Sequence, residues 1–217
     1  MASRNYLIMS GDISITDKKD YRMNALAAGL ERCGLKGIGD INADVLGLEA
    51  IPQNNKASRV KAIKDYIAQG TWPKSIDQRE LAPLTDLVVP AAQDSWLTAA
   101  LAAVGTPYTC LNALATPQLL QGLLMVCYGI SVESAAVPMP VSRVTFRRGG
   151  AAGNIQAQFD MEPMGVRQEV DAFFSEPVVI DPNEVFAIQV LCRNATLAFE
   201  RVHVHNFLFE SAGNVIA

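Results

Sequence analysis

The fold is decided by the stretch Ile155-Gln156-Ala157-Gln158-Phe159-Asp160-Met161-Glu162, in which apolar and polar residues alternate strictly. Successive side chains of a β-strand point to opposite faces, so this period of two is typical of a strand that is buried on one side. The 141–148 segment upstream alternates in the same way, and the 149–154 segment between them is rich in glycine. Because glycine readily adopts the positive φ angles of tight turns, the two segments are predicted to form a hairpin.

Similar short segments recur on both sides of this hairpin, and turn signals such as Asp181-Pro182-Asn183 separate them. The predicted strands cover residues 84–89, 108–111, 123–133, 141–148, 154–162, 169–175, 184–192 and 197–209. Eight short strands of this kind indicate a mainly β protein, and we expect an antiparallel jelly-roll β-sandwich.

The N-terminal part of the chain follows a helical pattern. Apolar residues spaced three and four apart predict helices over residues 18–33 and 56–69, and Asn55 is a suitable N-cap for the second. Residues 96–104 fit either a helix or a strand, and their alanines favour a helix.

Charge divides the chain into two regions. Residues 1–80 contain 12 Lys and Arg against 10 Asp and Glu, whereas residues 81–217 contain 6 against 12. We therefore expect an N-terminal helical arm region over 1–80 and the jelly-roll β-sandwich over 81–217. The acidic second region argues against broad nucleic-acid binding there. The predicted basic helix, which runs from Lys56 to Gln69, would suit contact with a genome or with an internal membrane.

Residues 95–131 contain no charged side chain, in a protein with only 18% charged residues overall. One sandwich core is not expected to hold every large side chain of this stretch, because strands alternate and loops run over the surface. We therefore expect part of it to lie at the subunit interface of a homo-oligomer. The residues expected at that interface are Trp96, Leu101, Tyr108, Leu120 and Leu124.

The two histidines of the chain, His203 and His205, lie two positions apart in a predicted strand and should share a face. Together with Glu210 they resemble the H-x-H-x(3,4)-E portion of the first motif of the cupins, which are also jelly rolls. That resemblance implies an alternative function, a metal-binding enzyme with His203, His205 and Glu210 as ligands. Because the chain has no third histidine, we expect no metal and no cofactor.

Other catalytic motifs give little support for an enzyme. The chain has no Gly-x-Ser-x-Gly elbow and no papain-like cysteine context, and the Gly-rich 148–153 segment lacks the lysine of a phosphate-binding loop. The four cysteines have no Cys-x-x-Cys spacing and are expected to be reduced and buried. They are Cys33, Cys110, Cys127 and Cys192. We expect no catalytic residues, and a ligand-binding β-sandwich remains a further alternative.

The C-terminal part of the chain resembles the last strands of viral jelly-roll coat proteins. The run from Phe174 to Ile188 carries this resemblance with a strand, a proline-bounded turn and a second strand, and the aromatic 197–210 segment follows. The resemblance implies a structural virion protein, a subunit of an icosahedral capsid that assembles in the host cytoplasm with its own copies and other virion proteins. The N-terminal region has no dense arginine-rich tail, so a tailless bacteriophage shell fits better than a plant-virus-like one.

Overall fold

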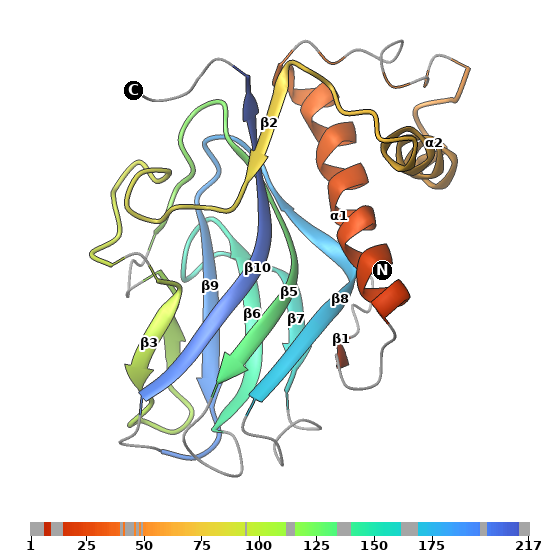
Figure 1. The fold of residues 1–217 in the computed structure, drawn as a ribbon. Helices are drawn as coiled ribbons and strands as arrows, with labels where there is room; N and C mark the ends of the chain where they lie inside the picture. The colour runs from red at the N-terminus through yellow and green to blue at the C-terminus, as the bar shows by residue number, and fades with distance from the viewer. Residues whose placement is uncertain are drawn as a thin grey trace.

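The computed structural model describes residues 7–9, 15–39, 41, 46, 48, 50–93, 95–111, 116–133, 140–161, 169–195 and 199–212. These residues form two facing antiparallel sheets, with two helices against the outer face of the larger sheet (Figure 1). The protein is therefore mainly β and sandwich-like, as the alternating patterns predict.

The larger sheet contains six strands within the described residues. Their order is β1 (Leu7–Met9), β8 (Glu169–Ile180), β5 (Leu124–Glu133), β10 (Phe199–Ser211) and β2 (Ile76–Arg79), with β3 (Leu97–Ala100) on the other end of β10. The smaller sheet has the order β4 (Pro107–Thr109), β9 (Phe186–Cys192), β6 (Val141–Arg148) and β7 (Asn154–Asp160). Because β1 and β2 come from the first 80 residues, that region contributes strands to the sandwich as well as helices.

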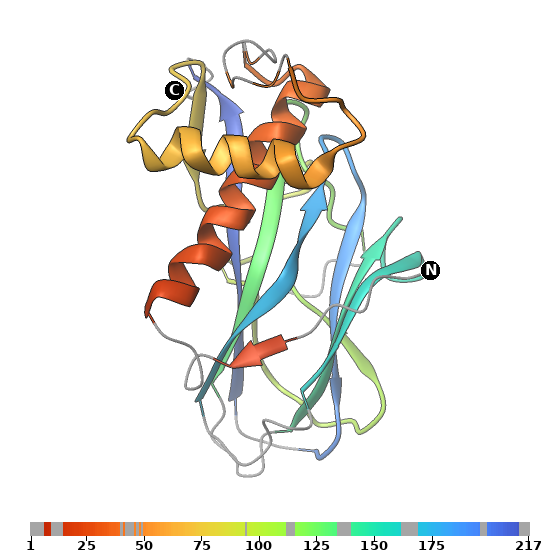
Figure 2. The same ribbon diagram turned by 90° about the vertical axis from the view of Figure 1, so that its right-hand side faces the viewer.

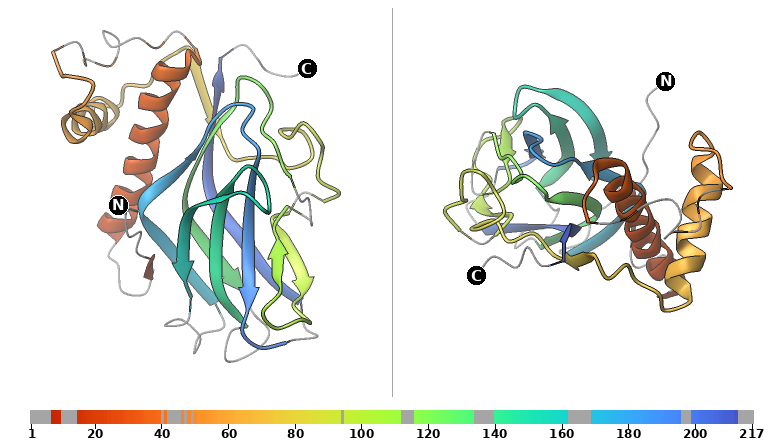
Figure 3. Two further views of the ribbon diagram at one scale, coloured as in Figure 1. Left: turned by 180° about the vertical axis from the view of Figure 1, so that it is seen from behind. Right: turned by 90° about the horizontal axis from the view of Figure 1, so that it is seen from above.

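Strands β3 to β10 pair in a nested manner. Strand β3 pairs with β10, β4 with β9, β5 with β8, and β6 with β7. Of these eight strands, β6 and β7 are consecutive within one sheet, and every other consecutive pair crosses to the opposite sheet. Figure 3 shows the strands of the smaller sheet from behind, on the face away from the helices.

The helices form a layer on the outer face of the larger sheet. Helix α1 (Ile15–Lys36) packs across β5, β8 and β10, and α2 (Lys56–Ala68) crosses α1 (Figure 2). The side chain of Asn55 caps α2 by accepting a hydrogen bond from Ser58 N at 3.2 Å, as predicted. An arm that extends away from the sandwich is not confirmed, because the apolar side of α1 is buried against the sheet.

Two hydrophobic clusters result from this layering. The inter-sheet core contains Phe146, Phe159 and Phe174, whose rings pack edge-to-face and stacked with centroids 4.1–5.9 Å apart. A second core between the sheet and the helices contains Leu30 and Phe209, among others. Strand β5 contributes to both cores, so its residues are buried on both faces over most of its length.

Two local predictions are wrong. Residues 97–100 form a strand and not part of a helix, because β10 offers a pairing partner, with Leu97 opposite Val202. The predicted strand at 84–89 is a turn with one isolated bridge at Leu87, because the carboxylate of Asp86 holds the turn from inside. At 97–100 a tertiary contact outweighs the local preference, whereas at 84–89 a local side-chain-to-backbone hydrogen bond replaces the predicted strand.

Ion pairs fasten the end of α1 to the turn after β8. Arg32 donates two hydrogen bonds to the carboxylate of Asp181, at 2.7 and 2.6 Å, and Lys36 Nζ lies 3.0 Å from the same carboxylate. The hydrogen bonds from Arg32 lower the pKa of Asp181 despite its partial burial, and Lys36 acts in the same direction.

Replacing Asp181 should produce a pH-dependent loss of stability. A carboxylate with a depressed folded-state pKa stabilises the fold fully above its unfolded pKa of about 3.9, and this contribution is lost as the pH falls through the lower folded value. Asp181→Asn should therefore lower the melting temperature at pH 7, and the difference from wild type should shrink below about pH 4. Asp65→Asn, which removes an exposed partner of Lys61, is the matched control and should change little. A constant Asp181→Asn effect down to pH 2 would contradict this assignment.

Gly29 should be intolerant of a side chain, because a Cβ there would overlap the ring of Phe209. Gly29→Ala should lower the free energy of unfolding by about 1–3 kcal/mol, as overpacking does in other cores. Gly34→Ala lies in the same helix, where the nearest obstacle is 3.4 Å from the added atom, and should be neutral or stabilise by up to about 1 kcal/mol. Urea denaturation of both variants measures the contrast, and equal effects would contradict the close packing of α1 on β10.

Candidate functional site

Three polar side chains meet on the outer face of the larger sheet, beside the N-terminal half of α1. They are Ser131 on β5, Asp171 on β8 and His205 on β10. His205 Nε2 lies 2.6 Å from Asp171 Oδ1 and 2.7 Å from Ser131 Oγ, and Ser131 Oγ donates to Asp171 Oδ1 at 3.0 Å. The nested pairing brings them together, since β5 lies between β8 and β10.

This cluster has the residue types of a serine hydrolase triad but a different geometry. In a triad the serine hydroxyl is hydrogen-bonded to one nitrogen of the histidine ring, and the carboxylate is hydrogen-bonded to the other. The imidazole can then accept the hydroxyl proton. Here both partners lie against the same nitrogen, Nε2 of His205, and the Ser131 hydroxyl donates a hydrogen bond to Asp171. A nitrogen that donates to Asp171 has no lone pair for Ser131, so this arrangement does not activate the serine.

Aromatic rings pack against the imidazole of His205 in this cluster. His205 stacks on Tyr128 and on Phe173, with ring centroids 5.8 and 5.9 Å apart, and Tyr21 of α1 stacks on Phe173 at 5.7 Å. His203 lies with its ring centroid 5.4 Å from that of His205. The pKa of His203 is lowered by partial desolvation and by the nearby His205, while Glu80 and Asp171 act in the opposite direction.

The residues of the predicted metal site do not come together. His203 and His205 share a face, as predicted, but Glu210 lies toward the far end of β10 and accepts a hydrogen bond from Arg79 Nε at 2.7 Å. No group of three or more His, Cys, Asp or Glu among the described residues is arranged to hold a metal ion. The ligand set implied by the cupin resemblance is therefore not assembled.

The five residues predicted at an interface are buried or partly buried in the folded chain. Trp96 and Leu101 are buried in the inter-sheet core and Leu124 in the helix-covered core, while Tyr108 and Leu120 are partly buried against the inter-sheet core. The inter-sheet core thus takes up more of these side chains than expected, and the helix-covered core takes up Leu124. Tyr108 and Leu120 keep some exposure, and an interface at these residues stays a prediction.

Fewer basic side chains of α2 are exposed and unpaired than the sequence indicated. Arg59 turns inward, where it is 8% exposed and donates to Glu31 Oε1 at 2.9 Å. Lys61 pairs with Asp65 at 3.0 Å on the helix surface. Lys56 is exposed, and no carboxylate partner is seen for it within the described part of the chain.

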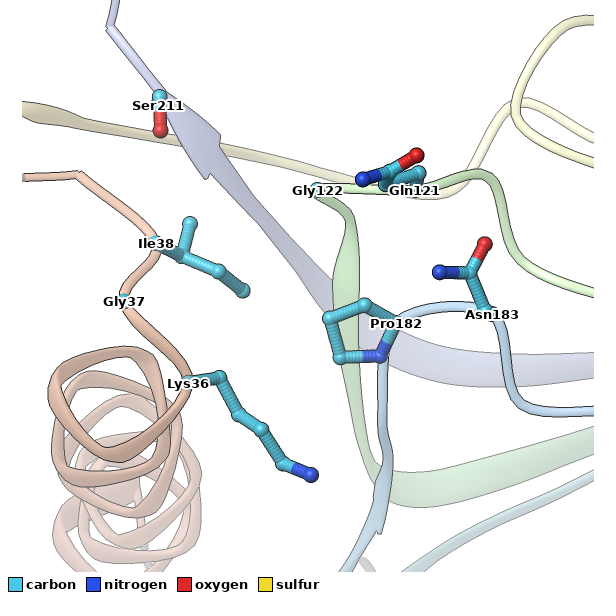
Figure 4. A pocket seen from close by; sticks show the side chains of 8 residues that line it. All are labelled: Lys36, Gly37, Ile38, Gln121, Gly122, Pro182, Asn183 and Ser211. Carbon is cyan, nitrogen blue, oxygen red and sulfur yellow. The ribbon is translucent and has the colours of Figure 1, made fainter.

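Two surface recesses border the C-terminal end of α1. The first has a volume of about 330 Å³, and Figure 4 shows Lys36 and Ile38 on one wall facing Pro182 on the other. The second, of about 750 Å³, is a groove between α1, α2 and β8. Its wall contains the Arg32–Asp181 ion pair and Glu31, which pairs with Arg59. The same wall also contains Lys56 and Glu176, for which no ion pair is seen among the described residues.

All four cysteines are free thiols and buried, as predicted. Burial raises the pKa of Cys33 and of Cys110 to about 12, and it raises the pKa of Cys127 and Cys192 as well. Because the thiolate is the reactive form, these cysteines should be inert at neutral pH.

Comparisons with known proteins identify no relative of this chain: no family model, no curated protein and no solved structure matches it. Among the described residues, no helix is both long and apolar enough to span a membrane.

Ser131 should be unreactive toward a fluorophosphonate, a reagent that labels activated serines. Its hydroxyl is hydrogen-bonded to Asp171, and His205 Nε2 is engaged by the same carboxylate. We expect intact-protein mass spectrometry to show the same low labelling for wild type, His205→Ala and Ser58→Ala, the last removing an exposed serine of α2. Stoichiometric labelling of wild type that disappears in His205→Ala would contradict this view and revive an enzymatic function.

Proposed function

We propose that this chain is a structural virion protein, a subunit of an icosahedral capsid whose main body is a jelly roll. The observation that carries the proposal is the nested pairing of β3 to β10. A jelly roll is a long antiparallel hairpin wrapped into two sheets, and such wrapping pairs the first strand with the last and the second with the next to last. The order β4-β9-β6-β7 in one sheet and β3-β10-β5-β8 in the other is what this wrapping requires.

The jelly roll occurs in capsid proteins, in lectins and in cupins, so the fold alone does not select the function. The cupin alternative needs a ligand set that Glu210 does not join, since its carboxylate is engaged by Arg79. A lectin-like alternative needs a recess with converging polar groups. In the wall of the 750 Å³ groove Arg32, Asp181 and Glu31 are engaged in ion pairs, whereas Lys56 and Glu176 are not paired among the described residues. The engagement of Glu210 therefore disfavours the cupin alternative, and the ion pairs in the groove are the weaker evidence against a lectin-like one.

The way in which the layers of the subunit are joined suits a shell protein. Two cores share β5, and the helical layer is fastened to the sandwich by Arg32 and Lys36 on Asp181. We expect a subunit built in this way to keep its shape when neighbours bind, which would let it repeat the same contacts in a symmetric assembly. Its partners in this proposal are its own copies and other virion proteins. The exposed Lys56 and Lys61 of α2 would be its contact with a genome or an internal membrane.

Self-assembly tests the proposal directly. The purified full chain should form closed particles or large regular oligomers, seen by negative-stain electron microscopy and by sedimentation velocity. Phe174→Ala, which deletes a fully buried ring at a cost of about 3–5 kcal/mol, controls for disordered aggregation and should give irregular material instead. A wild-type chain that remains a monomer at every accessible concentration would overturn the proposed function.

A further inference from the structure

The groove of about 750 Å³ between α1, α2 and β8 combines unengaged charges with accessible apolar surface. Lys56 on the first turn of α2 and Glu176 on β8 line it, and no ion pair is seen for either among the described residues. Its apolar lining includes Leu35, which is 47% exposed, and the half-buried Val60 and Val179. Figure 2 looks onto the side of the molecule on which α1, α2 and β8 meet. Such a combination is typical of a ligand site.

Ion pairs hold the three walls of the groove together. Arg32 of α1 binds Asp181, which directly follows β8, and Arg59 of α2 binds Glu31 of α1. The walls are thus joined within the subunit, and a ligand would not have to order them on binding.

The α1 wall gives the length of the groove. Its residues run from Asn24 to Leu35 at spacings of three and four, so they form one stripe along the helix. At 1.5 Å of rise per residue this stripe is about 16 Å long. About five residues of extended chain, at roughly 3.3 Å each, have the same length. The groove therefore fits a short extended segment.

The β8 wall offers hydrogen-bonding groups of the backbone. Among the described residues β1 pairs with β8 at residues 172–174, and the lining of the groove begins directly after them. Val179 O accepts a hydrogen bond from the side-chain amide of Gln156 at 3.2 Å, so this carbonyl points toward the groove. The N–H of a residue in an antiparallel strand points to the same side as its C=O, so Val179 N–H faces the groove too. An amide is thus already bonded at this edge, and the amides of a peptide can bond in the same way.

The two unengaged charges lie toward opposite ends of the groove. Glu176 is five positions before Asp181, which places it about 16 Å along the strand from the ion pair that joins Asp181 to α1. Lys56 is one helical turn from Arg59, and Arg59 binds Glu31 of α1. Because Glu31 is next in sequence to the α1 partner of Asp181, Lys56 lies near that end. A segment that spans the groove can therefore meet Glu176 with a basic residue and Lys56 with an acidic one.

We propose that this groove binds a short extended segment of a different protein. The segment is about five residues long and packs an apolar side chain against Leu35 and Val60. It directs a basic residue toward Glu176 and an acidic residue toward Lys56. The inference goes beyond the proposed function and does not rest on it, because peptide binding and self-assembly are measured separately. Where both hold, Lys56 contacts the peptide, and Lys61 alone remains for a genome or a membrane.

The edge strands of this chain do not supply such a segment. Within the described residues the strands at sheet edges are β1, β2, β3, β4 and β7, and β2 alone contains both a basic and an acidic residue. Its basic residue, Arg79, is already bound to Asp86 and Glu210. A second folded copy therefore offers no matching strand among these, which favours a different protein as the partner.

A library of random heptapeptides displayed on phage tests this inference. Panning against the purified full chain should enrich sequences in which a basic and an acidic residue flank apolar ones. A fluorescein-labelled copy of the most enriched peptide is then titrated, with fluorescence polarisation as the readout. Lys56→Glu and Glu176→Lys should each weaken its binding at least about fivefold, because each turns an attraction into a repulsion. Lys64→Glu is the matched control, since Lys64 is on α2 but does not line the groove, and should change binding less than about twofold.

Panning against the Glu176→Lys variant should replace the basic residue of the enriched sequences by an acidic one. Circular dichroism should give the wild-type spectrum for all three variants, because none of the substituted side chains is buried. Enrichment of no sequence by the wild type, or equal weakening by Lys64→Glu, would overturn the inference. Concentration-dependent dimers that Glu176→Lys abolishes, with no peptide enriched, would assign the groove to a second copy and overturn it as well.

Discussion

The packing of α1 across the larger sheet is the interaction on which the rest of the structure depends. Gly29 allows the helix to approach the ring of Phe209, and the stripe that contains Leu30 closes over the outer face of β5 and β10. A β-sandwich without this layer would expose one face of each sheet to water. The helix therefore converts a two-layer protein into a three-layer one with a second hydrophobic core.

This second core helps to explain why the 95–131 stretch has no charged residue. A two-layer sandwich would leave many of its side chains on the surface, but here Leu123 and Leu124 point to different cores and both are buried. Burial within the folded chain, in two cores, therefore accounts for much of the uncharged stretch. Among the described residues, half of the six large apolar side chains that remain exposed lie in the 82–90 loop, where a turn held by Asp86 carries them outward.

The nested strand order also decides which polar groups meet. Ser131, Asp171 and His205 are up to 74 residues apart, and they touch because β8, β5 and β10 are neighbours in one sheet. These three residues have the types found in a catalytic triad but not its geometry. Asp171 Oδ1 and Ser131 Oγ both lie against the same ring nitrogen, Nε2 of His205. The aromatic rings of Tyr128 and Phe173 fix the imidazole in that position.

The sequence by itself determined the features that depend on neighbouring residues. Alternation predicted β6, β7 and β9 within a few residues, and a continuous apolar run predicted β5. Asn55 predicted the start of α2, because capping is a local property of the backbone. Only the tertiary structure decided that residues 97–100 form a strand, that Glu210 binds Arg79 instead of joining the histidines, and that α1 covers the sheet. Each of these depends on a partner roughly a hundred or more residues away, such as β10 for β3. The energy of such a pairing outweighs local propensity but leaves no periodic trace in either segment.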